Sequence, residues 1–182
     1  EFGIPKTYED YGEMLKAEEL DIVDICAPNS IHCPAALAAF KQGRHVYCEK
    51  PMTLTIAEGQ QLAEAVQKSG RTFLVGTQQR SFQRFQTACE LVRNGRLGKL
   101  RQIDIAVPEN REGGPFQNEP VPASLDWERW LGPAPEVAYC PERFRVFRSW
   151  YEYSGGSMTD WGAHHIDIAQ WAMGADNSGP VS

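Results

Sequence analysis

The chain has 182 residues, of which 42% are hydrophobic and 23% charged, as is ordinary for a globular protein. Its formal net charge of −6 argues against a nucleic-acid partner, because binding a phosphate backbone requires clustered cations. No apolar run approaches the roughly 18 residues that span a membrane, so no membrane partner is expected. The five irregularly spaced cysteines favour reduced thiols in a cytoplasm-like setting over a disulfide framework.

The first eighty residues alternate between helix and strand signals. In chain order they predict a helix at 8–20, a strand at 21–27, a helix with Pro34 in its first turn that ends at Gly43, a strand at 45–48, a helix at 55–69 closed by Gly70, and a strand at 71–76. The run at 21–27 is rich in β-branched residues, which is typical of a strand buried on both faces. This alternation predicts βαβ crossovers and a parallel, Rossmann-type sheet.

The pattern changes beyond residue 80. It predicts a helix at 82–94, a half-buried strand at 100–107, a long loop at 108–125, a short helix at 126–131 and a helix at 159–173. We therefore expect two domains. Residues 1–80 would form part of a parallel α/β domain, and residues 81–182 part of an α+β domain with a mostly antiparallel sheet.

Glu49-Lys50-Pro51 follows one of the predicted buried strands. In parallel sheets ligands bind at the carboxyl ends of the strands, so this tripeptide lies where a ligand is expected. A lysine there can donate to a substrate oxygen and stabilise developing negative charge. Pro51 restricts Lys50 to an extended backbone and permits a cis peptide bond. The alternative interpretation is a solvated turn between strand and loop.

A second candidate group lies on the last predicted helix. Asp160, His164, Asp167 and Trp171 follow helical spacing and share one face. A carboxylate one turn from a histidine can orient the ring for general-base catalysis. The alternatives are a solvated polar stripe, which the apolar residues of this helix disfavour, and a metal site. Neither an HExxH motif nor a cysteine pair supports a metal, and none is predicted.

Two further features are ambiguous. Pro28 and Asn29 follow the first strand, with His32 close behind, and they can contact a cofactor or simply form a turn and a helix start. The aromatic and arginine cluster at 144–153 suits sugar stacking, but core packing is the preferred interpretation.

These features together resemble the glucose–fructose oxidoreductase/inositol dehydrogenase/MocA (Gfo/Idh/MocA) family. The resemblance is carried by residues 27–32 (APNSIH), by residues 45–51 (HVYCEKP), and by Asp160-x-Gly162-x-His164-x-x-Asp167 after a glycine pair. It extends from about Thr7 to Gly174, and the order and separation of the motifs make it specific.

The resemblance implies hydride transfer between a secondary alcohol of a carbohydrate or polyol and NAD or NADP. It implies that Lys50, Asp160 and His164 are catalytic and contact the substrate, together with Trp161. It also implies a cofactor cleft lined by Pro28, Asn29, His32, Glu49, Lys50, Gln79 and Arg80. A glycoside hydrolase or lyase that oxidises its substrate transiently, and a non-catalytic regulatory homologue, remain alternatives.

The family's glycine-rich phosphate loop and the residue that selects NAD or NADP belong upstream of Glu1, and later strands of the second sheet belong after Ser182. No G-x-G-x-x-G motif occurs in the chain. We therefore expect the chain by itself to bind a nicotinamide cofactor poorly and its parent to bind it well. The parent is expected to be a cytoplasmic homo-oligomer, or a periplasmic one if an export signal precedes Glu1.

Overall fold

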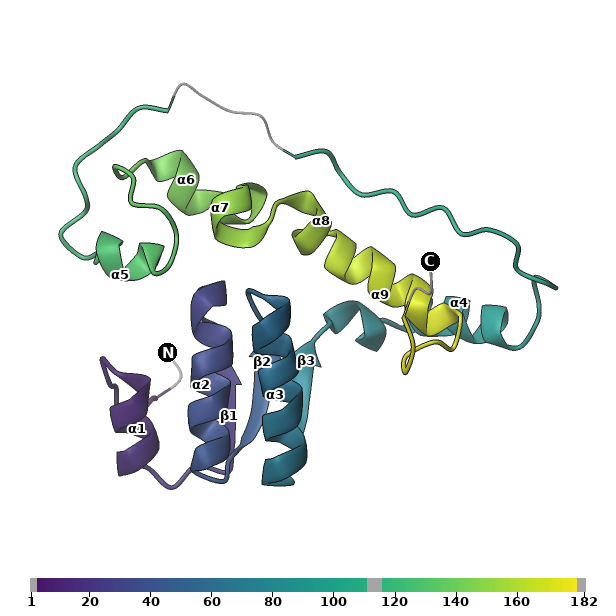
Figure 1. The fold of residues 1–182 in the computed structure, drawn as a ribbon, viewed down its shortest axis with the longest axis horizontal. Helices are drawn as coiled ribbons and strands as arrows, with labels where there is room; N and C mark the ends of the chain where they lie inside the picture. The colour runs from purple at the N-terminus through teal and green to yellow at the C-terminus, as the bar shows by residue number, and fades with distance from the viewer. Residues whose placement is uncertain (1–2, 111–115, 180–182) are drawn as a thin grey trace. The chain divides into compact units, whose positions relative to one another are not determined.

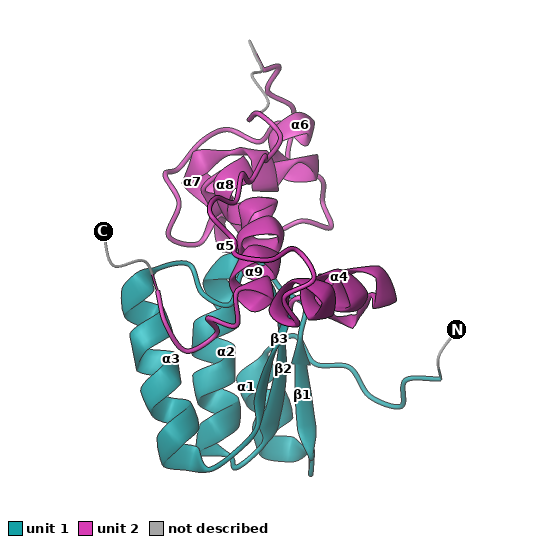
Figure 2. Ribbon diagram, turned by 90° about the vertical axis from the view of Figure 1, so that its right-hand side faces the viewer, with its two compact units in different colours: residues 1–76 teal, residues 77–182 magenta. Residues whose placement is uncertain are grey.

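The computed structural model describes residues 3–110 and 116–179. The chain divides into two compact units, Glu1–Gly76 and Thr77–Ser182 (Figure 2). The division falls directly after the last strand of the first unit, whereas the sequence pattern placed the boundary at residue 80.

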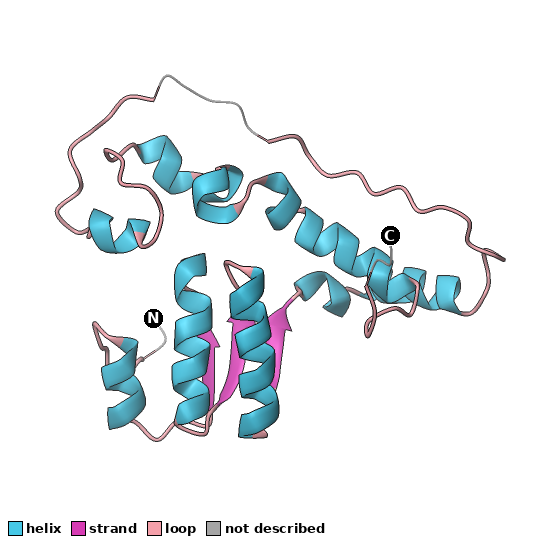
Figure 3. Ribbon diagram, in the orientation of Figure 1, coloured by secondary structure: helices cyan, strands magenta, loops and turns pink. Residues whose placement is uncertain are grey.

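The first unit is a three-stranded parallel sheet with helices between its strands (Figures 1 and 3). Its elements are α1 (Tyr11–Ala17), β1 (Ile22–Ile25), α2 (Asn29–Lys41), β2 (His45–Glu49), α3 (Ile56–Ser69) and β3 (Phe73–Gly76). The strand order is β1-β2-β3, and both neighbouring pairs run parallel. The predicted Rossmann-type parallel sheet is confirmed.

Only one face of this sheet is buried by the described residues. Along β1 the burial alternates between exposed and buried residues, with Val23 and Ile25 in the core and Ile22 63% exposed. The core side packs against α2 and α3 (Figure 2). The prediction that the first strand is buried on both faces is therefore wrong for this chain, because no described helix covers its second face.

Helix α2 begins at Asn29, so Pro34 lies inside the helix and not in its first turn as predicted. A proline there removes one intrahelical hydrogen bond. Burial compensates for this loss, because Ala35, Ala36 and Ala39 are each at most 5% exposed. Their small side chains allow α2 to pack closely on the sheet.

All the regular secondary structure in the described residues of the second unit is helical, and long loops connect the helices (Figure 3). Its elements are η1 (Gln78–Ser81), α4 (Gln83–Arg93), α5 (Trp127–Leu131), α6 (Pro141–Arg145), η2 (Phe147–Ser149), α7 (Tyr151–Ser154), α8 (Ser157–Asp160) and α9 (Gly162–Ala172). Helix α4 packs along α9. No described helix combines the length and apolar composition needed to cross a membrane.

The expected antiparallel sheet is absent from the described part of the second unit. Residues 100–107 alternate as a strand should, yet they pair with no strand among the described residues. An isolated extended segment cannot satisfy its backbone hydrogen bonds as a sheet does. The described part of the expected loop at 108–125 contains neither helix nor strand, and residues 111–115 lie outside the description.

Aromatic side chains form the second unit's own core. Trp127, Leu131, Tyr139 and Tyr153 are each at most 9% exposed. The indole N–H of Trp127 donates to the carbonyl of Val137 at 2.8 Å. Further aromatic residues pack against this cluster, among them Trp130, Phe144, Phe147 and Trp150. Core packing, the preferred interpretation of the cluster at 144–153, accounts for these contacts.

Candidate active site

In the first unit the candidate residues meet at the carboxyl edge of the sheet. Glu49 ends β2 and lies opposite Gly76, the last residue of β3. A Cβ added to Gly76 would lie 2.9 Å from Glu49 Oε1 and 3.1 Å from the Tyr47 hydroxyl. Glycine at position 76 therefore lets the Glu49 side chain lie across the neighbouring strand.

The Glu49 carboxylate is also held by the next residue. The backbone N–H of Lys50 donates to Glu49 Oε2 at 3.0 Å. Lys50 is partly buried and precedes Pro51 through a cis peptide bond. The carboxylate is thus fixed by both the strand end and the loop that follows.

His32 joins two loops at this edge. It is 1% exposed, and its ring nitrogens lie 2.7 Å from the carbonyl oxygen of Pro51 and 2.9 Å from that of Ala27. The ring bridges the end of the β1–α2 connection and the start of the β2–α3 connection. Its two nitrogens are engaged by backbone carbonyls, so its closest contacts hold the scaffold in place.

Asn29 lies at the end of the connection between β1 and α2. It is the first residue of the helix, with Pro28 as its N-cap, and it is 7% exposed. Pro28 and Asn29, two of the seven residues expected to line the cofactor cleft, therefore form a helix start at the carboxyl edge of the sheet, where ligands of parallel sheets bind.

Two carboxylates, those of Glu49 and Asp24, act on the neighbouring side chains of this part of the sheet. Burial, and then the nearby carboxylates of Glu49 and Asp24, raise the pKa of the Tyr47 phenol. Burial, followed by Glu49, raises the pKa of the Cys48 thiol to about 12. Carboxylates near this edge can stabilise a nearby cation such as the Lys50 ammonium and accept hydrogen bonds from hydroxyl groups.

In the second unit a glycine pair leads into the candidate helix. Gly155 and Gly156 both have positive φ, 78° and 74°, which side-chain-bearing residues rarely adopt. A Cβ on Gly156 would lie 2.5 Å from the Asn110 side chain, whose Oδ1 accepts from the Ser157 N–H at 2.6 Å. The glycines thus allow Asn110 to cap the start of α8. Thr159 Oγ1 donates to the carbonyl of Ser154.

The candidate acid–base residues lie on the path from α8 into α9. Trp161 joins the two helices with helical angles, φ −76° and ψ −36°, so the predicted helical spacing is kept. His164 is 5% exposed. The Asp160 side chain is 17% exposed and lies 3.7 Å from Arg148, measured from Oδ2 to Nε. A buried imidazole one turn from a carboxylate is an arrangement suited to proton transfer.

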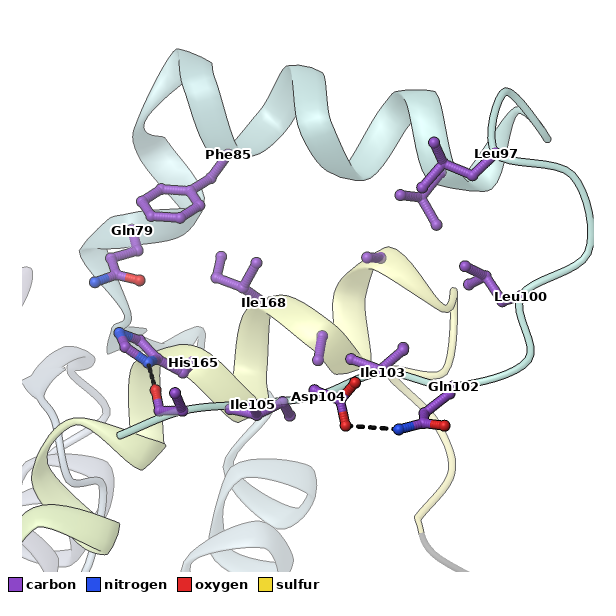
Figure 4. A pocket seen from close by; sticks show the side chains of 14 residues that line it. Gln79, Phe85, Leu97, Leu100, Gln102, Ile103, Asp104, Ile105, His165 and Ile168 are labelled. Carbon is purple, nitrogen blue, oxygen red and sulfur yellow. Dashed lines mark hydrogen bonds between the residues drawn. The ribbon is translucent and has the colours of Figure 1, made fainter. Parts of the chain in front are cut away.

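Helix α9 also borders an apolar pocket of about 510 Å³ (Figure 4). Phe85 on α4 and Ile168 on α9 point into it, and the extended segment 100–106 runs along its side. His165 lies at its rim, where Nδ1 is 2.7 Å from the carbonyl oxygen of Ala106. His165 therefore contacts the extended segment, while His164, its neighbour in the chain, is the more buried of the two.

Three further predicted site residues lie in the second unit. Gln79 lines the same pocket, and no described hydrogen-bond donor reaches its buried Oε1. Arg80 forms ion pairs with Asp167 and Asp176. Trp161 is 45% exposed, and its ring makes an edge contact with the His165 ring, with 5.9 Å between the ring centres.

Within the described residues no three His, Cys, Asp or Glu side chains gather as a metal site would require.

Comparison with protein-family models matches both units. Residues 1–77 match an "Oxidoreductase family, NAD-binding Rossmann fold" model, and residues 112–182 match the "Oxidoreductase family, C-terminal alpha/beta domain" model of the same family. The chain belongs to the Gfo/Idh/MocA family of oxidoreductases.

Relatives within the Gfo/Idh/MocA family include dehydrogenases of polyols and sugars. The chain is 26% identical to myo-inositol 2-dehydrogenase of Thermotoga maritima over 174 residues. This aligned region covers 96% of this chain and 42% of the relative. It is 27% identical over 173 residues to D-glucoside 3-dehydrogenase of Escherichia coli K12, with 95% and 41% covered. The chain thus spans about two fifths of the length of these relatives.

Solved structures of oxidoreductases also resemble this chain. Aldose-aldose oxidoreductase from Caulobacter crescentus, complexed with glycerol, superposes with a TM-score of 0.62 at 28% identity, over 92% of this chain and 41% of that one. GenD2 from gentamicin A biosynthesis, in complex with NAD, has a TM-score of 0.67 at 22% identity over 93% of this chain and 40% of that one, which supports the fold alone.

Sequence reasoning missed three contacts in this Gfo/Idh/MocA chain. It did not foresee that Gly76 makes room for Glu49, that Asn110 caps α8, or that Arg80 binds Asp167. The glycine at a strand end was a usable signal. The other two pairs are separated by 47 and 87 residues, and no local pattern reveals them.

Proposed function

We propose that this chain forms part of a nicotinamide-dependent dehydrogenase that oxidises a secondary alcohol of a sugar, polyol or sugar derivative. The observation that carries the proposal is the chemistry of the two half-sites. One presents Glu49 and Lys50 at the carboxyl edge of a parallel sheet, and the other presents a buried His164 one turn from Asp160. A pure binding protein has no need of such a proton-transfer set.

The residues at the sheet edge fit the ribose and nicotinamide half of the cofactor. A fixed Glu49 carboxylate can accept from ribose hydroxyls, and Asn29 at the start of α2 adds an amide. The buried Gln79 Oε1 offers a further acceptor, since no described donor reaches it. The diphosphate half needs a glycine-rich loop at a helix N-terminus, and the sequence contains no G-x-G-x-x-G motif. We assign Pro28, Asn29, His32, Glu49, Lys50, Gln79 and Arg80 to this cleft as a proposal.

A bound nicotinamide supplies the acceptor for the substrate's hydride. In our proposal His164 takes the proton of the reacting hydroxyl while the C–H bond breaks. The Lys50 ammonium donates a hydrogen bond to the same oxygen and stabilises its developing negative charge. Asp160 orients the His164 ring or binds a second substrate hydroxyl, and the exposed face of Trp161 packs against the sugar.

Sugars and polyols are the substrate class that the relatives' names support. The relatives act on inositol and on glucosides, both of which carry several secondary alcohols. Asp160, His164 and Lys50 offer both acceptors and donors to such hydroxyls.

We also propose that residues 100–107 form a strand of the antiparallel sheet expected for the second domain. The matched family model describes an alpha/beta domain, yet the described residues of this unit contain no strand. Ile103 and Ile105 are 40% and 42% exposed and alternate with polar residues, as in a strand that covers a core. Slow amide hydrogen exchange across 102–106 in the complete protein would support this assignment.

The experiment that tests the proposed function is substitution of Lys50 in the complete protein. We expect Lys50→Ala to lower the turnover of NAD(P)H formation with inositols and aldoses about 100- to 1,000-fold, because one electrostatic donor to the reacting oxygen is removed. Binding of NAD(H), measured by titration calorimetry, should weaken far less than turnover falls, because the other residues of the proposed cleft are unchanged. The control is Lys68→Ala, which removes an exposed lysine that pairs only with Glu64 among the described residues.

Unchanged turnover in Lys50→Ala would contradict the mechanism. If the unmodified protein cleaves aryl glycosides without net reduction of NAD(P), the hydrolase or lyase alternative replaces the dehydrogenase. If it binds cofactor but does neither, a non-catalytic role is supported.

A further inference from the structure

Arg80 and Asp167 form a two-pronged ion pair within the second unit. Arg80 Nε donates to Asp167 Oδ2 and Nη2 donates to Asp167 Oδ1, both at 2.7 Å. This fork matches a guanidinium to a carboxylate in a single orientation, which a lysine ammonium cannot reproduce. Both side chains are largely shielded, with exposures of 32% and 22%. The two hydrogen bonds therefore fix the orientation of the Arg80 guanidinium relative to the Asp167 carboxylate as well as the distance between them.

Neighbouring groups strengthen this arrangement. Arg80 Nη2 also donates to Asp176 Oδ1 at 2.8 Å. The guanidinium lies 5.4 Å from the centre of the Trp171 ring, and that of Arg93 lies 5.7 Å from the same centre. The hydrogen bond to Asp167 is the largest factor that raises the pKa of Arg80 above its ordinary value.

The pair fixes a helix that carries the candidate base. Arg80 belongs to η1, which follows β3, while Asp167 lies on α9 one turn after His164. Residues three apart on a helix lie on the same side, so holding Asp167 fixes the rotation of α9 that aims the His164 ring. Asp160, one turn before His164, has a separate partner in Arg148.

We propose that Arg80 and Asp167 are positioning residues that set the direction of His164. Asp167 is then a structural anchor and not a proton acceptor, although the sequence places it on the face of the acid–base pair. This inference rests on the proposed function for the role of His164. For Arg80 it replaces the cofactor contact proposed above, because Asp167 and Asp176 already engage two of the three guanidinium nitrogens.

Steady-state kinetics on the complete protein separate these two tasks. We expect Arg80→Lys and Asp167→Asn each to lower kcat about 10- to 100-fold, because small misplacements of a catalytic group are costly, and to leave the KM for NAD(P) within about twofold. The kcat of the double variant should be no lower than that of either single variant, since each substitution removes the same two-bond ion pair. Arg93→Lys is the matched control, because Arg93 faces the same tryptophan but forms neither a hydrogen bond nor an ion pair with Asp167 in the described part of the chain. It should behave as the unmodified protein.

A readout that needs no turnover keeps the positioning claim separate from the proposed function. The His164 imidazole signals in a ¹H–¹⁵N spectrum, assigned by their loss in His164→Gln, should shift in Arg80→Lys and Asp167→Asn but not in Arg93→Lys. Thermal melting of each variant confirms that it is folded. If the unmodified protein oxidises no sugar or polyol, the proposed function fails while these signals still test the anchor.

Two outcomes would overturn the positioning claim. One is a raised KM for NAD(P) at unchanged kcat, which would make Arg80 a cofactor ligand. The other is a set of His164 signals that does not move in folded Arg80→Lys and Asp167→Asn.

Discussion

The position of the Glu49 side chain at the edge of the sheet depends on a hydrogen bond from Lys50 and on the absence of a side chain at Gly76. The Lys50 N–H fixes one carboxylate oxygen, and the missing side chain of Gly76 leaves room for the other. The same logic recurs at Gly156, where the Asn110 amide occupies the space that a Cβ would need. At the residue scale, two glycines set the geometry around groups that are themselves polar.

We expect Gly76→Ala to lower the free energy of unfolding by about 1 to 3 kcal/mol, because the added methyl group overpacks against Glu49 and Tyr47. Urea denaturation measures the change. The control is Gly59→Ala, whose Cβ would meet nothing closer than 3.5 Å inside α3, and which should be neutral or stabilising by roughly 0.5 to 1 kcal/mol. Equal stability of the two variants would show that the contact at Gly76 relaxes without cost.

At the scale of elements, the helix ends explain why the connections at the sheet edge are well defined. Helix α3 begins with a capping box. Thr55 Oγ1 accepts from the Glu58 N–H at 3.2 Å, and Glu58 Oε2 accepts from the N–H groups of Thr55 at 3.1 Å and Leu54 at 2.8 Å. At the other end Gly70 adopts the left-handed conformation with φ 63°. Both ends were foreseen, because caps are local and depend on residues within one turn.

Loss of the cap should be measurable. We expect Thr55→Ala to destabilise the first unit by about 1 kcal/mol, since a backbone N–H at the start of α3 loses its acceptor. Thermal or urea unfolding reports the difference. Thr55→Ser keeps the hydroxyl and serves as the control, so a comparable loss in Thr55→Ser would show that the methyl group and not the cap is responsible.

At the scale of the whole molecule, the chain combines two units of different construction. The first buries a mainly aliphatic core between one face of a parallel sheet and the helices α1, α2 and α3, and the second buries an aromatic core among short helices. The family models assign a nucleotide-binding fold to the first and an alpha/beta domain to the second. The proposed reaction draws residues from both, so the chemistry depends on the complete protein.

Cofactor binding tests this dependence. Because the sequence contains no glycine-rich phosphate loop, we expect the 182-residue chain by itself to bind NAD(H) and NADP(H) more weakly than calorimetry can detect in the micromolar range. The complete protein is the positive control. Micromolar binding by the 182-residue chain would show that the described edge of the sheet suffices to hold the cofactor.

The sequence by itself determined the parallel sheet, the positions of most helices and the two candidate half-sites. These features depend on local information: apolar runs of strand length, helical spacing, caps, and polar residues directly after a strand. It also placed Asp160 and His164 one turn apart, which the helical backbone at Trp161 preserves.

Only the tertiary structure decided which side chains hold one another. Several features depend on residues distant in the chain: the exposure of one face of β1, the engagement of both His32 nitrogens and the Arg80–Asp167 ion pair. The same holds for the lack, among the described residues, of a partner strand for residues 100–107. Whether a segment is buried or paired depends on the other segments that pack against it. A local sequence pattern indicates only which environment and which secondary structure that segment favours. Glu49-Lys50-Pro51 and His32 were therefore visible in the sequence, while the contacts by which Gly76, the Lys50 N–H and His32 hold this edge in place were not.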